Sequence, residues 1–304
     1  MAHGSKRAVF AALAANLAIA VFKFTAALIS GSSSMLAEGY HSVSDTFNQV
    51  LLLIGIKRGH RAPDWDHPFG HGKAQFFWSF LVAVILFGVA GTLSIREGIH
   101  KLSHPEPLSH LWLNYLAIAF ALVFEFVALR LAFRSLKEEK QVEHHKNFWQ
   151  AIRQSKNPVT LTVLFEDSLA ILGLLVAAAG ITLVRLTGNL IYDAAASILI
   201  GVLLMGFAVF LALETKKLLL GEAVTPYKRE QILAAVREFS EVEKIISLKT
   251  MHLSPDEVLL TLELTYIDDL KVPQLEDLND RIEKAIQAII PKAQVYLEPE
   301  NIPD

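Results

Sequence analysis

The stretch AEGYHSVSDTFNQ, residues 37–49, places ionisable side chains inside an apolar segment that is long enough to cross a bilayer. A charge at the bilayer centre costs about 2.5–3.5 kcal/mol on insertion scales, so such residues are rare and usually functional. His41 and Asp45 are four residues apart, which places them on one face of a helix, and Glu38 roughly shares that face. The stretch therefore predicts a polar site within a membrane-spanning helix.

Apolar residues make up 53% of the 304 positions, and the mean hydropathy of +0.40 is high for a soluble protein. A spanning helix needs about 20 mostly apolar residues. Six runs of that kind predict six transmembrane helices, at residues 8–30, 34–56, 76–96, 111–133, 159–185 and 190–213. The chain has no cysteine, which excludes disulfides and thiolate metal sites.

Basic residues are distributed unequally between the two sets of predicted loops, and this bias sets orientation in a membrane. One side carries Lys6, Arg7, Lys57, Arg58, Arg61, Lys73, Arg134, Lys137, Lys140, Lys146, Arg153 and Lys156. The other side carries only Arg96, Lys101 and Arg185. We expect the first side, with both termini, to face the cytoplasm.

The composition changes near residue 220, which predicts a transmembrane domain over residues 1–220 and a soluble domain over residues 221–304. In the second part, apolar and polar residues alternate along VLLTLELTY (residues 258–266), as in a half-buried strand. Helical periods and turn residues on either side give the order αββαβ. We expect a small ferredoxin-like α+β domain with both helices on one face of the sheet.

An imidazole and a carboxylate one helical turn apart form a common platform for a divalent ion such as zinc. The alternative for His41 and Asp45 is a buried hydrogen-bonded pair that fixes helix packing. The membrane favours the metal, because Ser or Thr can supply polar packing at lower cost. The fifth run adds Glu166 and Asp167, which point about 100° apart in a helix. We expect one of them to face the same centre as Asp45, the alternative being a protonated acid that only packs.

Three further embedded charges are weaker signals. We expect Lys23 to extend its ammonium to a membrane surface. Glu125 is consistent with a proton path or with an interhelical salt bridge, Arg130 being close to it in sequence. Asp193 lies at the start of the sixth run, where helix capping or a water-filled vestibule accounts for it.

The loop HRAPDWDHPFGHGKAQ, residues 60–75, contains Asp64, His67 and His71 among prolines and glycines. His67 and His71 are four residues apart. A second, exposed metal site and an ordinary solvated loop are equally consistent with this spacing.

The motifs SGSSSMLAEGYHSVSD (residues 30–45) and HPFGHGKAQFFWSFLVAVILFGVAG (residues 67–91), with an acid in the fifth run followed by Gly173, resemble the cation diffusion facilitator family of zinc transporters. The six runs and the αββαβ tail resemble it too. VLFED (residues 163–167) resembles the branch that contains the mitochondrial zinc-transporter-like proteins. Members of the family are homodimers that exchange Zn²⁺, or sometimes Mn²⁺, Fe²⁺, Co²⁺ or Cd²⁺, for protons.

The resemblance implies that His41, Asp45 and Asp167 are metal ligands. The family's other ligand in the fifth span falls on Val163, which cannot bind a metal, so Glu166, Glu38 or a water molecule is expected to complete the shell.

The resemblance also assigns Asp64, His67 and His71 to the family's cytoplasmic loop metal site. Lys73 matches a lysine that pairs with an acid of the other protomer, and Glu222 is the candidate acid.

We therefore expect a metal:proton antiporter that exports Zn²⁺, or Mn²⁺, Fe²⁺, Co²⁺ or Cd²⁺, from the cytoplasm by alternating access. The metal is its substrate, protons are the counter-ion, and the partners are a second copy and the lipid bilayer. We expect a multi-pass protein of the bacterial inner membrane, with no nucleic-acid partner and no enzymatic activity. The alternatives are a membrane-embedded zinc metalloenzyme and a metal sensor.

Overall fold

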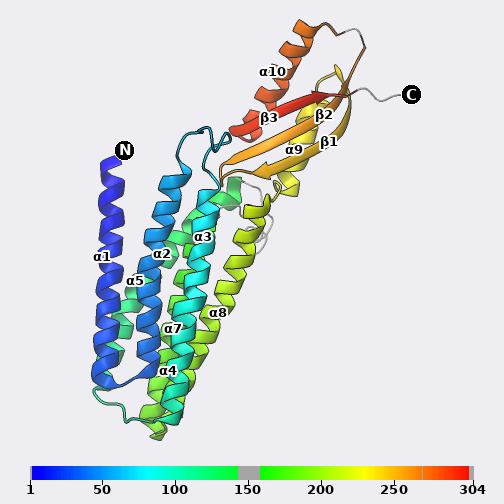
Figure 1. Ribbon diagram of the computed structural model, residues 1–304. Coiled ribbons are helices and arrows are strands. Elements are labelled where there is room, and N and C mark those ends of the chain that lie inside the picture. Colours follow the sequence, from blue (N-terminus) through cyan, green and yellow to red (C-terminus); the bar gives the residue numbers. More distant parts are fainter. Residues whose placement is uncertain (1, 143–157, 269, 301–304) are drawn as a thin grey trace. The chain divides into compact units, whose positions relative to one another are not determined.

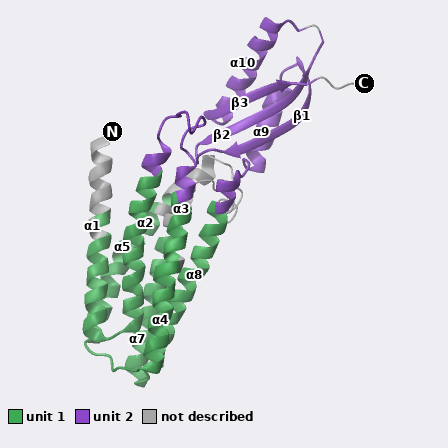
Figure 2. Ribbon diagram, in the orientation of Figure 1, with its two compact units in different colours: residues 1–55, 78–138, 158–215 green, residues 56–77, 139–157, 216–304 purple. Residues whose placement is uncertain are grey.

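A computed structural model describes residues 2–142, 158–268 and 270–300 of the chain. It divides into two compact units, coloured separately in Figure 2. The first unit contains residues 1–55, 78–138 and 158–215, and the second contains residues 56–77, 139–157 and 216–304.

Long helices build the first unit, and Figure 1 shows them lying alongside one another. They are α1 (Ala2–Ser30), α2 (Ser33–Gly59), α3 (Ala74–Ile85), the π-helical turn η1 (Leu86–Gly91), α4 (Thr92–Ser103), α5 (Leu111–Val142), α7 (Pro158–Thr187) and α8 (Ile191–Leu220). Because α3, η1 and α4 follow one another without a break, six long helical segments occupy the positions of the six predicted spans. Gly31, at φ +73°, makes the sharp turn between α1 and α2.

Four of these segments are long and apolar enough to cross a membrane, counting only described residues: Ala74–Ser103, Leu111–Leu131, Leu164–Thr187 and Ile191–Leu220. The described apolar part of α1, Asn16–Ser30, is shorter. The polar residues of α2 lower its mean hydropathy, so α2 does not meet the same criterion. The four segments make the chain a multi-pass membrane protein, as predicted.

Apolar side chains from α1, α2, α3, η1, α5, α7 and α8 form one buried cluster in this unit, which includes Met35, Leu86, Leu174 and Leu204. Small residues let helices approach closely within it. A Cβ atom on Gly201 of α8 would lie 2.6 Å from the side chain of Ile95 in α4, so only glycine fits there.

The second unit contains the predicted αββαβ domain. Its elements are α9 (Pro226–Arg237), β1 (Val242–His252), β2 (Glu257–Tyr266), α10 (Val272–Ile289) and β3 (Lys292–Pro299). The sheet has the order β1-β2-β3, with β1 antiparallel and β3 parallel to β2.

Alternate residues of β2 are buried, namely Val258, Leu260, Leu262 and Leu264, and they share one apolar cluster with both helices. The predicted strand period and the placement of both helices on one face are therefore confirmed. Pro226 begins α9, and the hydroxyl of Thr225 caps that helix by accepting from the Lys228 backbone N–H.

Candidate functional site

His41 and Asp45 lie one turn apart on α2 and are buried, at 1% and 9% exposure. Their nearest polar atoms, Nδ1 and Oδ1, are 3.3 Å apart. That contact lacks hydrogen-bond geometry, so both ring nitrogens of His41 and Oδ1 of Asp45 have no hydrogen-bond partner within the described structure. Buried polar atoms are nearly always paired, and orphans of this kind are explained by strain, a catalytic role, or a bound water molecule or ion.

The acids of α7 face the same region. Glu166 Oε1 accepts a hydrogen bond of 2.9 Å from the side-chain amide of Asn48 on α2. This bond links α2 to α7 and accounts for the buried position of Asn48. Asp167 Oδ2 is buried and has no hydrogen-bond partner among the described residues.

A small cavity brings the two helices' acids together. Its lining comes from α1, α2, α5 and α7 and consists of Asn16, Ile19, Ser42, Asp45, Gln49, Glu125, Glu166 and Asp167. Its volume is about 10 Å³, close to what one water molecule needs. Both Glu166 and Asp167 line it, so the expectation that only one of them faces the centre near Asp45 is wrong.

Glu38 faces elsewhere. The ammonium of Lys23 on α1 donates to Glu38 Oε2 at 2.8 Å, and both side chains are fully buried. The prediction that Lys23 reaches a membrane surface is therefore wrong, because a carboxylate within the bundle binds its ammonium. The second oxygen of Glu38 lies against Gly173 of α7, where any Cβ atom would collide with it. In this conformation Glu38 binds Lys23 and does not line the cavity with Asp45.

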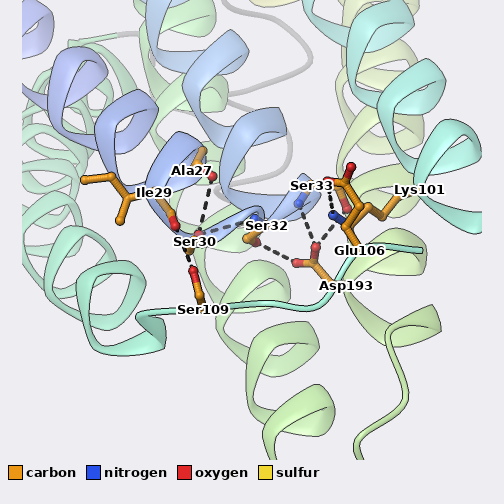
Figure 3. Close-up of polar contacts among 9 residues, drawn as sticks. All are labelled: Ala27, Ile29, Ser30, Ser32, Ser33, Lys101, Glu106, Ser109 and Asp193. Carbon is orange, nitrogen blue, oxygen red and sulfur yellow. Dashed lines mark hydrogen bonds and ion pairs between the residues drawn. The ribbon is translucent and has the colours of Figure 1, made fainter. Parts of the chain in front are cut away.

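Asp193 stabilises the beginning of α2 (Figure 3). Its carboxylate accepts hydrogen bonds from the Ser33 backbone N–H at 2.6 Å and from the hydroxyls of Ser32 at 2.7 Å and Ser33 at 2.9 Å. The first N–H groups of a helix lack partners within it, and a negative charge there is favourable. Of the two readings left open by the sequence, the structure supports capping, with the cap supplied by α8 to α2.

The loop residues Asp64, His67 and His71 lie close together in the second unit. Asp64 Oδ2 is 2.8 Å from His71 Nε2, and Asp64 Oδ1 is 3.3 Å from His67 Nδ1. Hydrogen bonding by His71, followed by that from the His67 backbone N–H, lowers the pKa of the Asp64 carboxyl. Gly70, at φ +82°, closes the turn that brings the histidines together.

Asp64, His67 and His71 form a set whose potential ligand atoms all lie within 4.8 Å of one another, the only such set of three among the described residues. Their arrangement suits a divalent ion bound by nitrogen and oxygen. His41, Asp45 and Asp167 lie around the buried region described above but do not form so tight a set in this conformation.

Lys73 follows this loop, and its ammonium lies 3.6 Å from the sulfur of Met251. The backbone carbonyl of Glu222 accepts from the His252 N–H at 3.0 Å. The pairing of Lys73 with Glu222 of a second copy stays a prediction. The side chain of Val163 lies outside the described residues.

Known proteins share this sequence pattern. Residues 9–220 match the family described as the cation efflux transmembrane domain. The mouse mitochondrial proton-coupled zinc antiporter SLC30A9 is 32% identical over 86% of this chain and 46% of its own length. Metal tolerance protein C4 of Arabidopsis thaliana is 34% identical over 83% of this chain and 55% of its own length.

The chain thus spans about half the length of these two relatives. The manganese efflux system protein MneP of Bacillus subtilis is 25% identical over 93% of this chain and 91% of its own length. The family consists of transporters and not of enzymes, which confirms the expectation of a non-enzyme. From the match over residues 9–220, we conclude that the chain belongs to the cation efflux family of membrane metal transporters, on the branch of the SLC30A9-like proteins.

Proposed function

We propose that this chain exports a divalent metal ion from the cytoplasm in exchange for protons, with Zn²⁺ as the principal substrate and Mn²⁺ as a second one. The supporting observation is the cavity lined by Asp45, Glu166 and Asp167, with orphaned polar atoms on α2 and α7. The relatives named as a proton-coupled zinc antiporter and a manganese efflux protein support the choice of ions.

Charge is the physical basis of the proposal. A doubly charged ion within hydrocarbon needs negative side chains to offset the loss of its hydration. Asp45 and Asp167 supply two carboxylates, and His41 supplies a neutral nitrogen. Nitrogen and oxygen donors together suit Zn²⁺ but also admit Mn²⁺, Fe²⁺ and Co²⁺.

In this proposal protons are exchanged for the metal ion at the same carboxylates. Metal ligands bind in their deprotonated forms, so metal binding releases protons and acid opposes it. On the cytoplasmic side the carboxylates lose protons and bind the metal. On the opposite side protons displace the metal and neutralise the empty carboxylates, and the site can then reopen to the cytoplasm.

Alternating access requires two arrangements of the helices around one site. In this conformation the ligand atoms of His41, Asp45 and Asp167 are not gathered within single-ion distance. We propose that metal binding draws α2 and α7 together around the ion. A ligand shifts a conformational equilibrium only through its difference in affinity for the two states, and an assembled shell provides that difference.

The basic loops favour placing both termini in the cytoplasm of a bacterial cell, with the chain in the inner membrane. We propose that the chain acts as a homodimer in which Lys73 pairs with Glu222 of the second copy. We further propose that Asp64, His67 and His71 bind a metal ion on the cytoplasmic side, supported by their mutual distances.

Uptake of ⁶⁵Zn²⁺ and Mn²⁺ into proteoliposomes under an imposed pH gradient tests the proposal. We expect Asp45→Ala and Asp167→Ala to abolish uptake driven by the gradient, and Glu230→Ala, which removes an exposed acid of α9, to leave it unchanged. Gradient-driven uptake at the wild-type rate in both aspartate variants would contradict the proposal. Val163→His tests the missing ligand, and we expect it to shift the preference from Mn²⁺ towards Zn²⁺.

A further inference from the structure

Glu125 on α5 is an acidic side chain that the family motifs do not assign. It lines the same cavity as Asp45, Glu166 and Asp167 and lies close enough for its charge to act on all three. Within the described residues it forms no hydrogen bond and no ion pair, so the interhelical salt bridge considered from the sequence is not made. The cavity that Glu125 lines contains three other acids, Asp45, Glu166 and Asp167, together with neutral residues of α1 and α2.

The other acids near the cavity are partly engaged. Lys23 neutralises Glu38 at 2.8 Å, and Asn48 holds one oxygen of Glu166 at 2.9 Å. Position 163, one turn before Asp167, is a valine and offers no donor atom. The α2–α7 pair thus lacks the donor that position 163 would supply.

The cavity also contains a direct indication of a ligand. Asp45 is nine-tenths buried and lines the cavity, and its Oδ1 has no hydrogen-bond partner in the described structure. A buried carboxylate oxygen without a donor is costly unless a cation, a proton or a water molecule occupies the site. Glu125 shares that cavity, so a cation placed there would experience the charges of both side chains.

We propose that Glu125 belongs to the transport site as its fourth acidic residue, contributed by α5, and that it binds the divalent ion in place of the donor that Val163 lacks. This inference rests on the proposed function. A carboxylate is a hard oxygen donor, so its presence shifts the selectivity of the site from Zn²⁺ towards Mn²⁺ and Fe²⁺. It also makes α5 a third helix whose position responds to the metal.

The test measures the metal concentration dependence of uptake into proteoliposomes for wild type, Glu125→Gln, Glu125→Asp and Glu106→Gln. Glu106 is the matched control, because it is an exposed acid paired with Lys101 at 3.5 Å and lies outside the cavity. We expect Glu125→Gln to raise KM about 10–100-fold, the range found when groups that support a metal site are removed. The increase should be larger for Mn²⁺ than for Zn²⁺, and Glu125→Asp should recover part of it.

Equilibrium binding of ⁶⁵Zn²⁺ to the detergent-solubilised protein, in a His67→Ala/His71→Ala background that removes the loop site, gives a second readout. An unchanged KM and an unchanged affinity in Glu125→Gln, with Asp167→Ala inactive, would overturn the role of Glu125 alone. Full activity in Asp167→Ala would overturn the proposed function itself. If Glu125→Gln does not elute as a single species, Glu125→His replaces it, and an unchanged ratio of the KM values for Zn²⁺ and Mn²⁺ then refutes the inference.

Discussion

Lys23→Met separates the buried ion pair between α1 and α2 and should strongly destabilise the helical unit. In the wild type the Lys23 ammonium donates to Glu38 Oε2 at 2.8 Å, with no exposure of either side chain. Methionine fills a similar volume but donates nothing. Both oxygens of Glu38 then lack a donor, because its other oxygen, Oε1, already has no hydrogen-bond partner within the described structure.

The loss of unfolding free energy in Lys23→Met can be calculated by assuming that Glu38 becomes protonated, which is the least costly way to remove its unpaired charge. An ordinary glutamate has a pKa of about 4.3, so taking up a proton at pH 7 costs about 3.7 kcal/mol, at about 1.36 kcal/mol for each pH unit. Removal of one partner from a buried ion pair costs about 3–5 kcal/mol, which agrees. Because protonation becomes easier in acid, the same calculation gives about 1 kcal/mol at pH 5.

A double-mutant cycle of unfolding free energies in detergent isolates the pair. Glu38→Gln leaves the Lys23 ammonium without its carboxylate. An ordinary lysine loses its proton at pH 7 at a cost of about 4.6 kcal/mol, so we expect a loss of stability of about that size. The double variant Lys23→Met/Glu38→Gln buries no charge, and we expect it to lie within about 1–2 kcal/mol of wild type, since apolar replacement of a buried pair is often neutral. Single variants that lose less than about 1 kcal/mol at pH 7, or whose losses simply add in the double variant, would refute this reasoning.

Three further changes test separate contacts. Gly173→Ala places a Cβ atom against Glu38 Oε1 and should lower the unfolding free energy by about 1–3 kcal/mol. Gly206 on α8 has open space around it, so the control Gly206→Ala should cost less than about 0.5 kcal/mol. Asp193→Asn removes the charge that caps α2 and should lower stability by about 1–3 kcal/mol in the same unfolding assay; wild-type stability would contradict the cap. Burial raises the pKa of the Tyr266 hydroxyl to about 12, so its neutral form stabilises the fold below about pH 10, and that contribution is lost as the pH rises from 10 towards 12. Absorbance at 295 nm should show one tyrosine that ionises near pH 12 and is missing in Tyr266→Phe.

The periodic parts of the fold follow from the sequence. The alternation along residues 258–266 predicts β2, and its buried residues are Val258, Leu260, Leu262 and Leu264. The apolar runs predict the helices because length and hydropathy are local properties that a membrane selects. The cap of α2 is different: Asp193 and Ser33 are 160 residues apart in the chain, and only the packing of α8 against α2 brings them together.

In the candidate site, too, local sequence predicts the face of a helix but not the contacts between helices. The spacing of His41 and Asp45 predicts their shared face, because the helical period fixes it. It does not decide the partner of Glu38, which is three residues before His41 and binds Lys23 on another helix. Glu125 is one acid in an apolar run, and nothing in its neighbours along the chain indicates the cavity that it lines.

The ion pair between Lys23 and Glu38 determines the charge balance of the acids that line the cavity. The ammonium of Lys23 neutralises one carboxylate, and the ion-pair distance shows that this carboxylate belongs to Glu38. Asp45, Glu125, Glu166 and Asp167 then face one small cavity without a lysine or arginine among its lining residues. Within hydrocarbon, four neighbouring carboxylates are stable only when a bound metal ion or protons neutralise them. One divalent ion and two protons carry the same charge, so either can satisfy the same acids without changing the total. The ion pair between α1 and α2 therefore holds the Lys23 ammonium on Glu38, and in the proposed antiport mechanism metal and protons compete for the remaining acids.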